Sequence, residues 1–465
     1  MYTLKKNIAY SLLYLLTIGI ILSGYFFVPN SDAEFPLLRS IIIVSATILL
    51  LKYFIYMVVS PWHNVYTQLR LHATQKKLTT TTNYNPKVSV LVPAWNEEEG
   101  VITTIKTLIK STYKNIEILV IDNASTDKTR RNVREFMKKY DYATKHHLAQ
   151  HASIVYIKED QQGKGYALNR GIRAAKGEII ISIDADCSVP PDTIQNFVNH
   201  FKDPEVMAAV GNVKIGNTQT IIGVVQYLEF LFSFYFKKCD SLLGSIYIIG
   251  GAAGAFRKEV FTKLGAYSVT NITEDIDLSL RIQHAGMKIV YAQDAVVFTE
   301  GATDIAGLIK QRLRWKRGRV ETFLKYRKLF FSTEKKHNKI LSWFILPLAV
   351  FGDIQLFFEL FFIVFLYIYS YLTHDFSSFI YGIIVVSSMF VVQIVFDRQE
   401  KKWGHLLLLA PIGWLLFYIS TFVEFRALLQ TSLSYLRKED VAWQKWKRKG
   451  VFLSIPKTNK TSSTH

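Results

Sequence analysis

The chain has 465 residues, of which 50% are hydrophobic, 14% aromatic and 20% charged, and its net charge is +19. A mean hydropathy of +0.16 is too high for an ordinary soluble domain, and the charged fraction is too high for a chain embedded wholly in lipid. Both extremes are therefore excluded, and we expect a membrane protein that includes a soluble domain.

The positive charge favours anionic lipid heads or a phosphate-bearing substrate as partners. Nucleic acid is not expected, because the basic residues cluster next to apolar segments. The two cysteines, Cys187 and Cys239, are too few for a disulfide framework, which fits a cytoplasmic domain. Cys187 has no Cys or His neighbours in the sequence that would make it a zinc ligand, so we interpret it as a small filler of the core.

Two apolar runs come first. Residues 8–28 contain no charged residue and would span roughly 31 Å as a helix, enough for the hydrocarbon core of a bilayer. Residues 41–59 form a second run with one charge, Lys52. A signal peptide is the alternative, but no small-residue cleavage site follows the first run. The Lys and Arg distribution places the N-terminus in the cytoplasm, with two transmembrane helices in residues 1–60 of a plasma-membrane protein and a linker over 61–86.

From residue 87 the sequence alternates between strand and helix signals. Strands are predicted over residues 88–92, 116–121, 153–157, 179–183 and 207–213, and helices over 97–110, 127–139, 163–175 and 222–238. This alternation indicates a mostly parallel sheet with helices on both faces. The helix over 222–238 is expected to lie on the membrane face or, alternatively, in the core.

Two carboxylates, Asp184 and Asp186, follow the β-branched run Ile179–Ile183. Ligands of an open parallel sheet bind beyond the carboxyl ends of its strands, and unpaired buried acids would be costly there. Mg²⁺ takes one or two carboxylates and fills its other positions with phosphate oxygens and water. The pair therefore suggests a cation that holds a diphosphate. The alternative is a solvated turn acid and a helix cap.

The first three predicted strands also end in polar segments. These segments are Pro93–Glu97, Asp122–Asp127 and Gln161–Asn169. Four polar strand ends in succession indicate a nucleotide cleft at a switch point of the sheet. A later glycine-rich stretch, Gly250–Arg257, lacks the spacing of a phosphate-binding P-loop, and we expect it to let the backbone approach a ligand closely.

Two further motifs come from the second half of the soluble region. Residues 273–275 (Thr-Glu-Asp) stand at a predicted helix start, where they could simply be a cap and its dipole partners. Gln311, Arg314 and Trp315 fall at i, i+3 and i+4, so they share one helix face. A guanidinium beside an amide suits a diphosphate leaving group. The alternative is a basic amphipathic helix that lies on lipid.

In combination, Asp122, Asp184-Ala-Asp186, Thr273-Glu-Asp275 and Gln311-x-x-Arg-Trp315 resemble the inverting, processive family 2 glycosyltransferases. This family includes the cellulose, chitin, hyaluronan and poly-β-1,6-N-acetylglucosamine synthases. The resemblance covers residues 87 to about 325 and the flanking apolar runs. It implies an α/β catalytic domain of the GT-A type, with a Rossmann-like, mostly parallel sheet, over residues 87–330 and inserted between transmembrane helices.

The resemblance also implies roles for the strand-end residues. The residues implied to bind the donor substrate are Pro93, Glu97, Asp122, Lys164 and Asp184. Asp122 and Lys164 would hold the uridine end. The chain departs from the family at the same turn, because an acid usually stands at the position of Asn123 and a glycine at that of Ala124.

The remaining roles concern the reaction itself. Asp186, with Asp184, would coordinate Mg²⁺ or Mn²⁺ on the diphosphate. Asp275, with Glu274 beside it, would act as the general base.

The last motif completes the implied site. Gln311 and Arg314 would bind the diphosphate, and Trp315 would form the floor of the acceptor site. The implied partners are a UDP-sugar, a growing polysaccharide, the bilayer and, as an additional candidate, a small accessory membrane subunit.

UDP-N-acetylglucosamine is the expected donor, because the size and the two leading spans look most similar to the poly-N-acetylglucosamine synthases. A hyaluronan-synthase-like polymerase and a lipid-directed glycosyltransferase are the alternatives. A different class of function, a non-catalytic transporter or sensor, would bind nucleotide but would have no use for a base at Asp275.

The region over residues 331–429 is expected to hold the other membrane helices. Residues 340–372 are too long for one span and too short for two, so we expect an interfacial helix to about residue 352 and a span from residue 354. Residues 378–396 and 405–429 are further candidate spans. Three crossings would put the tail, 430–465, outside, although its eight Lys and Arg residues favour the inside. The alternatives are that residues 405–429 form a re-entrant segment or that the run over 340–372 crosses the membrane differently.

Three acids, Asp353, Glu359 and Glu424, fall within or beside these apolar runs. Acids at such positions are costly unless they face water or a polar partner. Together with the many aromatic residues, they suggest a polar, aromatic-lined path for the polymer that starts next to Trp315. The alternative is that the aromatic side chains face lipid and the acids pair locally.

Overall fold

A computed structural model describes residues 51–78, 84–145, 152–373, 377–396, 407, 410 and 413–437. The span expected over residues 8–28 lies outside the described residues, as do the first part of the second span and most of the basic tail. The multi-pass arrangement in the membrane therefore stays a prediction.

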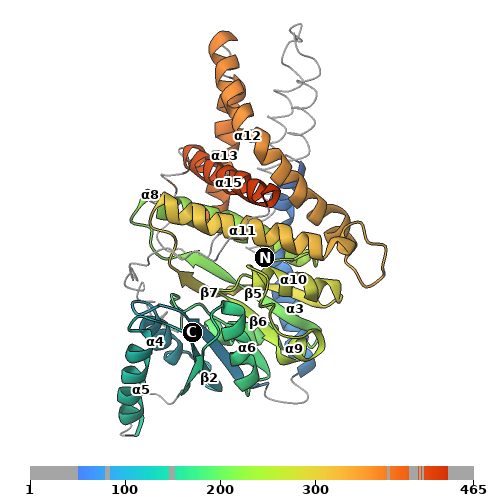
Figure 1. Cartoon of the computed structure of the whole chain (residues 1–465). Coiled ribbons are helices and arrows are strands. Elements are labelled where there is room, and N and C mark those ends of the chain that lie inside the picture. The colour runs from blue at the N-terminus through green and yellow to red at the C-terminus, as the bar shows by residue number, and fades with distance from the viewer. Residues whose placement is uncertain are drawn as a thin grey trace, which may run out of the picture.

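Seven strands form one sheet in the order β3-β2-β1-β4-β6-β5-β7 (Figure 1). The strands are β1 (Val88–Ala94), β2 (Ile116–Asn123), β3 (Ser153–Glu159), β4 (Ile179–Ser182), β5 (Val206–Ile215), β6 (Gly254–Arg257) and β7 (Lys288–Thr299). Only β6 among them runs against the others, pairing antiparallel with β4 and β5. The predicted mostly parallel sheet is confirmed. The strand order reverses between β1 and β4, so a crevice is expected at their carboxyl ends.

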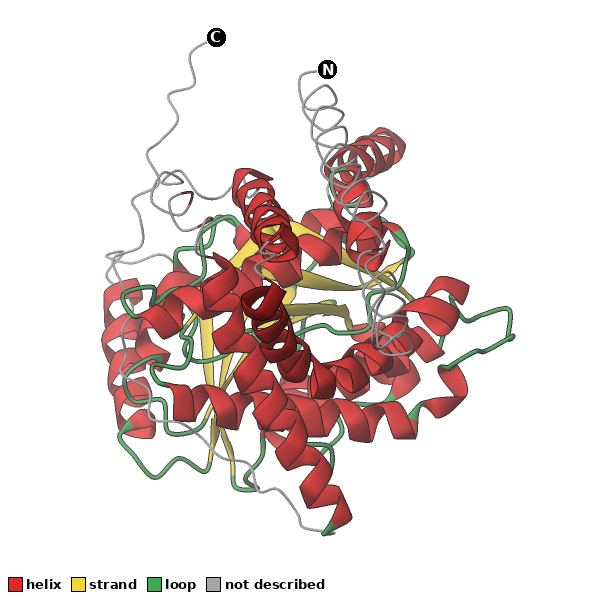
Figure 2. Cartoon of the chain, turned by 90° about the horizontal axis from the view of Figure 1, so that it is seen from above, coloured by secondary structure: helices red, strands yellow, loops and turns green. Residues whose placement is uncertain are grey.

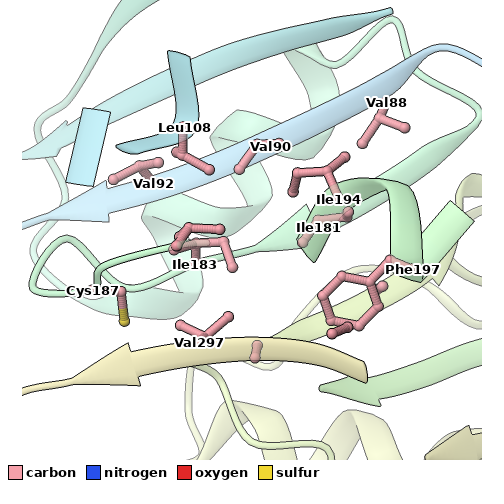
Figure 3. Packing of buried hydrophobic residues seen from close by; sticks show 14 of the residues in the cluster. Val88, Val90, Val92, Leu108, Ile181, Ile183, Cys187, Ile194, Phe197 and Val297 are labelled. Carbon is pink, nitrogen blue, oxygen red and sulfur yellow. The ribbon is translucent and has the colours of Figure 1, made fainter. Parts of the chain in front are cut away.

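Helices cover both faces of this sheet (Figure 2). One face packs on α4 (Val101–Ile109), α5 (Thr129–Lys145) and α7 (Thr193–His200), and the other on α6 (Lys164–Ala174), α9 (Lys258–Leu264) and α10 (Glu274–His284). Side chains alternate between the faces along each strand. Val88, Val90 and Val92 therefore pack with Leu108 and Phe197 on one face (Figure 3). Cys187 belongs to the same buried cluster, as expected for a core residue.

A second group of helices lies on one side of the sheet domain (Figure 1). It contains α8 (Ile221–Leu242), α11 (Ile305–Lys325), α12 (Leu346–Thr373), α13 (Ser377–Phe396) and α15 (Gly413–Leu436). Helix α8 lies between β5 and α13, because Tyr227 and Leu228 share a buried cluster with Ile215 and Phe390. Within the described residues, one helical stretch, Leu341–Phe365, is long and apolar enough to cross a bilayer.

The segment predicted as a linker contains a helix, α3 (Trp62–Leu78), that is attached to the sheet domain. Arg70 Nη2 lies 2.9 Å from His200 Nδ1, and His200 Nε2 lies 2.8 Å from Asp294 Oδ1. The ring of His63 also approaches Tyr291, with 5.6 Å between the centroids. These contacts continue the folded domain upstream of residue 87.

The helix break expected near residue 353 is wrong. A single turn of π-helix, Leu341–Ile345, leads into α12, which runs without interruption to Thr373. Asp353 remains inside the helix because Lys316 and Arg319 of α11 both form ion pairs with its carboxylate. A half-buried carboxylate with two cationic partners gives the helix no reason to end there.

Candidate active site

The Asp-x-Asp loop follows β4 at the edge where the crevice is expected. The Thr104 hydroxyl of α4 lies 2.8 Å from the carbonyl oxygen of Ala185 and 2.7 Å from that of Cys187, so it can donate to either. Asp186 is buried, with 2% of its surface exposed, and the Thr299 hydroxyl lies 3.4 Å from its Oδ1. Helix α4 and strand β7 therefore fix the loop from two sides.

Lys164 links the two acidic motifs. It is the first residue of α6, and its Nζ lies 2.6 Å from Asp184 Oδ1 and 3.7 Å from Glu274 Oε1. Burial opposes the charge on this amine, but the carboxylates of Asp184, Glu274 and Asp275 outweigh it and raise the pKa of Lys164. The Asp-x-Asp and Thr-Glu-Asp motifs thus meet at the amine of Lys164.

Asp275 is held by the backbone in the first turn of α10. The N–H of Gly251 donates to its Oδ2 at 3.0 Å, and the N–H of Ile276 donates to its Oδ1 at 2.9 Å. Asp275 is half-buried, whereas Glu274 is buried, and burial raises the pKa of Glu274. Of the two neighbouring acids, Asp275 is the more accessible to a substrate.

Gly251 belongs to the glycine-rich stretch that was expected to approach a ligand. A Cβ at this position would lie 2.6 Å from Lys164 Nζ and 3.6 Å from Asp275 Oδ2. A side chain here would have to move the lysine amine aside, so glycine at this position leaves the amine room beside Asp275. The backbone at Gly251 thus closely approaches the side chains of Lys164 and Asp275.

At the end of β2, Asp122 is buried and tied to its neighbours. The Tyr156 hydroxyl donates to its Oδ2 at 2.6 Å, the Ser125 N–H donates to its Oδ1 at 3.1 Å, and Arg130 Nε lies 3.7 Å from Oδ2. Tyr156 and Arg130 were not anticipated from the sequence, since neither is adjacent to a motif. They orient the carboxylate that the resemblance assigns to the uridine end.

The departure at Asn123 has a structural consequence. Its Oδ1 accepts a hydrogen bond from the Gly163 N–H at 2.8 Å, and its Nδ2 donates to the Gln161 carbonyl at 2.6 Å. A carboxylate could not make the second bond, because it has no donor. Ala124 next to it has a φ of 54°, the left-handed region that favours glycine. The turn thus keeps a glycine-type backbone and is tied to the loop before Lys164.

Pro93 and Glu97 lie on the same rim. Pro93 is opposite Ile121 in the register of β1 and β2. Glu97 is buried, and its N–H donates to the Thr129 hydroxyl at the start of α5 at 2.7 Å. Both residues therefore stand beside the turn that contains Asp122, as the sequence predicted, although their proposed contacts with a donor remain predictions.

Helix α11 bears the Gln-x-x-Arg-Trp motif and lies next to the Thr-Glu-Asp motif at the start of α10. A Cβ on Gly318 would lie 2.1 Å from the Thr273 hydroxyl, so the helix backbone packs directly on the start of the Thr-Glu-Asp motif. Arg314 is close enough for its charge to act on Glu274, where it opposes the effect of burial. Gln311 is buried, and its Oε1 has no hydrogen-bond partner within the described residues.

Trp315 is half-buried on α11. The guanidinium carbon of Arg312 lies 4.3 Å from the centroid of its ring, and the ring of Phe230 on α8 lies 6.4 Å away. The alternative that α11 is a basic helix on lipid does not hold for Arg312 and Lys316, because both are buried and paired with acids.

The acids expected beside a polymer path also have partners. Asp353 pairs with Lys316 and Arg319, Glu424 pairs with Arg312 and Lys316, and the Thr421 hydroxyl lies 3.4 Å from Glu359 Oε1. Local pairing, the alternative interpretation, therefore accounts for the charges of Asp353 and Glu424, whereas Glu359 is met by a hydroxyl group. Whether a polymer passes beside them stays a prediction.

The donor set at Asp184 and Asp186 fits a hard divalent cation. Within the described residues, no group of three or more His, Cys, Asp and Glu side chains is arranged to hold a metal alone. Two carboxylates suffice for Mg²⁺ or Mn²⁺ when a diphosphate and water supply the remaining oxygens. The amine of Lys164, which pairs with Asp184, adds a further positive charge on the side where the diphosphate is expected.

Comparisons with known proteins agree with this arrangement. Residues 89–265 match the family described as "Glycosyl transferase family 2", and residues 179–435 match "Glycosyl transferase family group 2". A "Poly-beta-1,6-N-acetyl-D-glucosamine synthase" of Staphylococcus epidermidis is 30% identical over 329 residues, which cover 68% of this chain and 76% of that protein. The Staphylococcus aureus (strain COL) protein of the same name is 28% identical over 283 residues, covering 60% of this chain and 65% of that one.

A solved structure shows the same fold. The mannosyltransferase PcManGT from Pyrobaculum calidifontis, in complex with GDP-Man and Mn²⁺, aligns over 83% of this chain and 99% of its own with a TM-score of 0.50 at 19% identity. The sheet, the motifs brought together at its edge and the family matches lead to one conclusion. The chain belongs to glycosyl transferase family 2.

Proposed function

We propose that this enzyme transfers N-acetylglucosamine from UDP-N-acetylglucosamine to the end of a growing β-linked polysaccharide, with inversion at the anomeric carbon. The observation that supports it most is Asp275, an accessible carboxylate held by two backbone N–H groups beside the Lys164–Asp184 pair. The name of the Staphylococcus epidermidis relative supports the choice of sugar.

In this proposal an acceptor hydroxyl attacks the anomeric carbon of the donor sugar. The new carbon–oxygen bond forms as the bond to the diphosphate oxygen breaks, and UDP leaves. The hydroxyl proton passes to Asp275, because a general base must remove it as the attack proceeds. Arg314 and Gln311 bind the diphosphate and stabilise its developing charge. Lys164, which the resemblance assigns to the uridine end, is assigned to the diphosphate here as well, because its amine pairs with Asp184. A divalent cation bound by Asp184 and Asp186 would neutralise the leaving group.

A non-catalytic nucleotide-binding protein is the competing class of function. Such a protein would need the Asp184–Lys164 end of the site but no base. The backbone of Gly251 and the first turn of α10 instead hold Asp275 in one orientation next to that end. Fixed geometry of an accessible carboxylate serves proton transfer, so catalysis is favoured.

The donor can be identified by product analysis. Purified protein with Mg²⁺ or Mn²⁺ is expected to convert radiolabelled UDP-N-acetylglucosamine alone into polymer and to release one UDP per sugar. Polymer that appears only after UDP-glucuronate is added would instead identify a hyaluronan-synthase-like enzyme. Label that appears only in a lipid fraction would identify a lipid-directed transferase, and no turnover of any UDP-sugar would contradict the proposed function.

Processive extension is part of the proposal and depends on Trp315. Sugar rings stack on aromatic side chains, and an enzyme that keeps its polymer between additions needs such a surface near the reaction. Replacing Trp315 by Ala is expected to shorten the products by roughly tenfold, since stacking on an aromatic ring contributes about 1 kcal/mol or more. UDP release without polymer growth should persist. Products of normal length from this variant would show that the chain is held elsewhere.

A further inference from the structure

Helix α11 presents two differently occupied faces. One includes the candidate site residues Gln311, Arg314 and Trp315. The other bears Arg312, Lys316 and Arg319, which pair with acids on three other helices. The ion pairs of this second face join Arg312 to Glu229 of α8 and Glu424 of α15, Lys316 to Asp353 of α12 and Glu424, and Arg319 to Asp353.

Arg312 is the member of this set that also touches the site. Its guanidinium carbon lies 4.3 Å from the centroid of the Trp315 ring. The same guanidinium forms an ion pair with Glu229, and its Nε lies 3.0 Å from Glu424 Oε1. The side chain is only 5% exposed, so it has little freedom to move.

The partners of Arg312 are themselves held. The Ser420 hydroxyl of α15 contacts the Glu229 carboxylate, and Lys316 Nζ lies 2.8 Å from Glu424 Oε2. Arginine suits this position because its planar group can stack on an indole while its edge pairs with carboxylates. A lysine would keep the charge but would lose the flat surface.

We propose that Arg312 is a positioning residue that fixes the ring of Trp315 for the acceptor sugar, and that Glu229 and Glu424 hold Arg312 in place. The proposal rests on the proposed function, in which Trp315 receives the acceptor. With one face of the indole covered by the guanidinium, the acceptor sugar stacks on the opposite face. Two helices outside the sheet domain, α8 and α15, thereby set the geometry of the acceptor site.

The test compares charge-balanced pairs of substitutions in the full-length protein. Arg312→Gln with Glu229→Gln removes both members of one ion pair, so no buried charge is left without a partner. Arg312→Lys keeps the positive charge and removes the planar stack. The matched control is Arg317→Gln with Glu321→Gln, because Arg317 also lies on α11, pairs with Glu321 at 2.7 Å and stacks 4.6 Å from the ring of Tyr435.

Mean product length, the KM for UDP-N-acetylglucosamine and the thermal unfolding midpoint are measured for each variant and for Trp315→Ala. The double variant is expected to shorten the products by roughly 2- to 30-fold, the range that loss of a cation–π contact implies. Arg312→Lys is expected to shorten them by less, because an ammonium keeps part of that attraction, and the donor KM of both variants should stay within about twofold of wild type. Arg312→Lys should do so with an unchanged unfolding midpoint. The control pair should leave product length unchanged.

Normal product length in Arg312→Lys and in the double variant, with short products from Trp315→Ala, would overturn the positioning role while leaving the proposed function intact. A loss of product length in the Arg317 control equal to that in the Arg312 variants would also overturn it, because the effect would then be general to α11. A wild-type protein that forms no polymer would instead contradict the proposed function itself.

Discussion

Asp275→Asn is expected to lower kcat for sugar transfer by about 10²- to 10⁴-fold, the usual contribution of a general base. An asparagine has nearly the same shape, and its one carbonyl oxygen can accept from either Gly251 N–H or Ile276 N–H, so one of the two backbone hydrogen bonds of Asp275 is kept and the other is lost. The ability to take the hydroxyl proton is lost, together with one backbone hydrogen bond and a negative charge that acts on Lys164. The affinity for UDP, measured by titration calorimetry, should change little.

The neighbouring acid provides the control. Glu274→Gln removes a carboxylate 3.7 Å from Lys164 Nζ in the same loop, and it is expected to raise the donor KM more than it lowers kcat. An Asp275→Asn enzyme that transfers sugar at the wild-type rate, or one that fails to bind UDP, would reassign the residue. A loss of kcat confined to Glu274→Gln would move the base to that position.

Much of the sheet could be predicted because its central strands have strong local signals. The β-branched run of β4 is bounded by Gly177, and the predicted strand over 179–183 ends within one residue of the observed Ile179–Ser182. The strand predicted over 116–121 extends to Asn123, because pairing with β1 and β3 continues the ladder past the apolar residues. Interior parallel strands are apolar on both faces and so are visible in the sequence.

Strands β6 and β7 were not predicted. Strand β6 has four residues, Gly254–Arg257, inside a glycine-rich stretch, and it becomes a strand only because β4 and β5 pair with it on either side. Strand β7 includes Gln293 and Asp294 where its register with β5 shifts, so its apolar pattern is interrupted. Both segments form strands because distant strands pair with them, and such pairing cannot be seen in the sequence of the segment itself.

The site shows the same division. The motif residues were recognisable, but the groups that hold them come from distant positions, as Thr104 does for the Asp-x-Asp loop and Tyr156 for Asp122. A threonine in a helix and a tyrosine in an edge strand have no sequence signature for such contacts. The partners of Asp353 and Glu424 on α11 were hidden for the same reason, because ion pairs between helices depend on how the helices pack.

Removal of divalent cations is expected to stop transfer. Asp186 is buried with 2% of its surface exposed, and Asp184 Oδ1 lies 2.6 Å from Lys164 Nζ. The loop therefore places two carboxylates and one amine where we expect the diphosphate to bind. The lysine supplies one positive charge, whereas a departing UDP carries more than one negative charge, including the one that develops as the bond to the sugar breaks. A divalent cation on the two carboxylates would supply the rest.

Transfer by the wild-type enzyme in excess EDTA should therefore fall at least about a hundredfold, since a bound cation contributes several kcal/mol of charge stabilisation, and added Mg²⁺ or Mn²⁺ should restore it. Asp186→Asn should show the same loss without recovery at the metal concentration that restores the wild type. Asp160→Asn is the matched control, because Asp160 is an exposed surface acid paired with Lys158. Full activity in excess EDTA would mean that Lys164 and Arg314 alone neutralise the leaving group, and the pair of aspartates would then need another role.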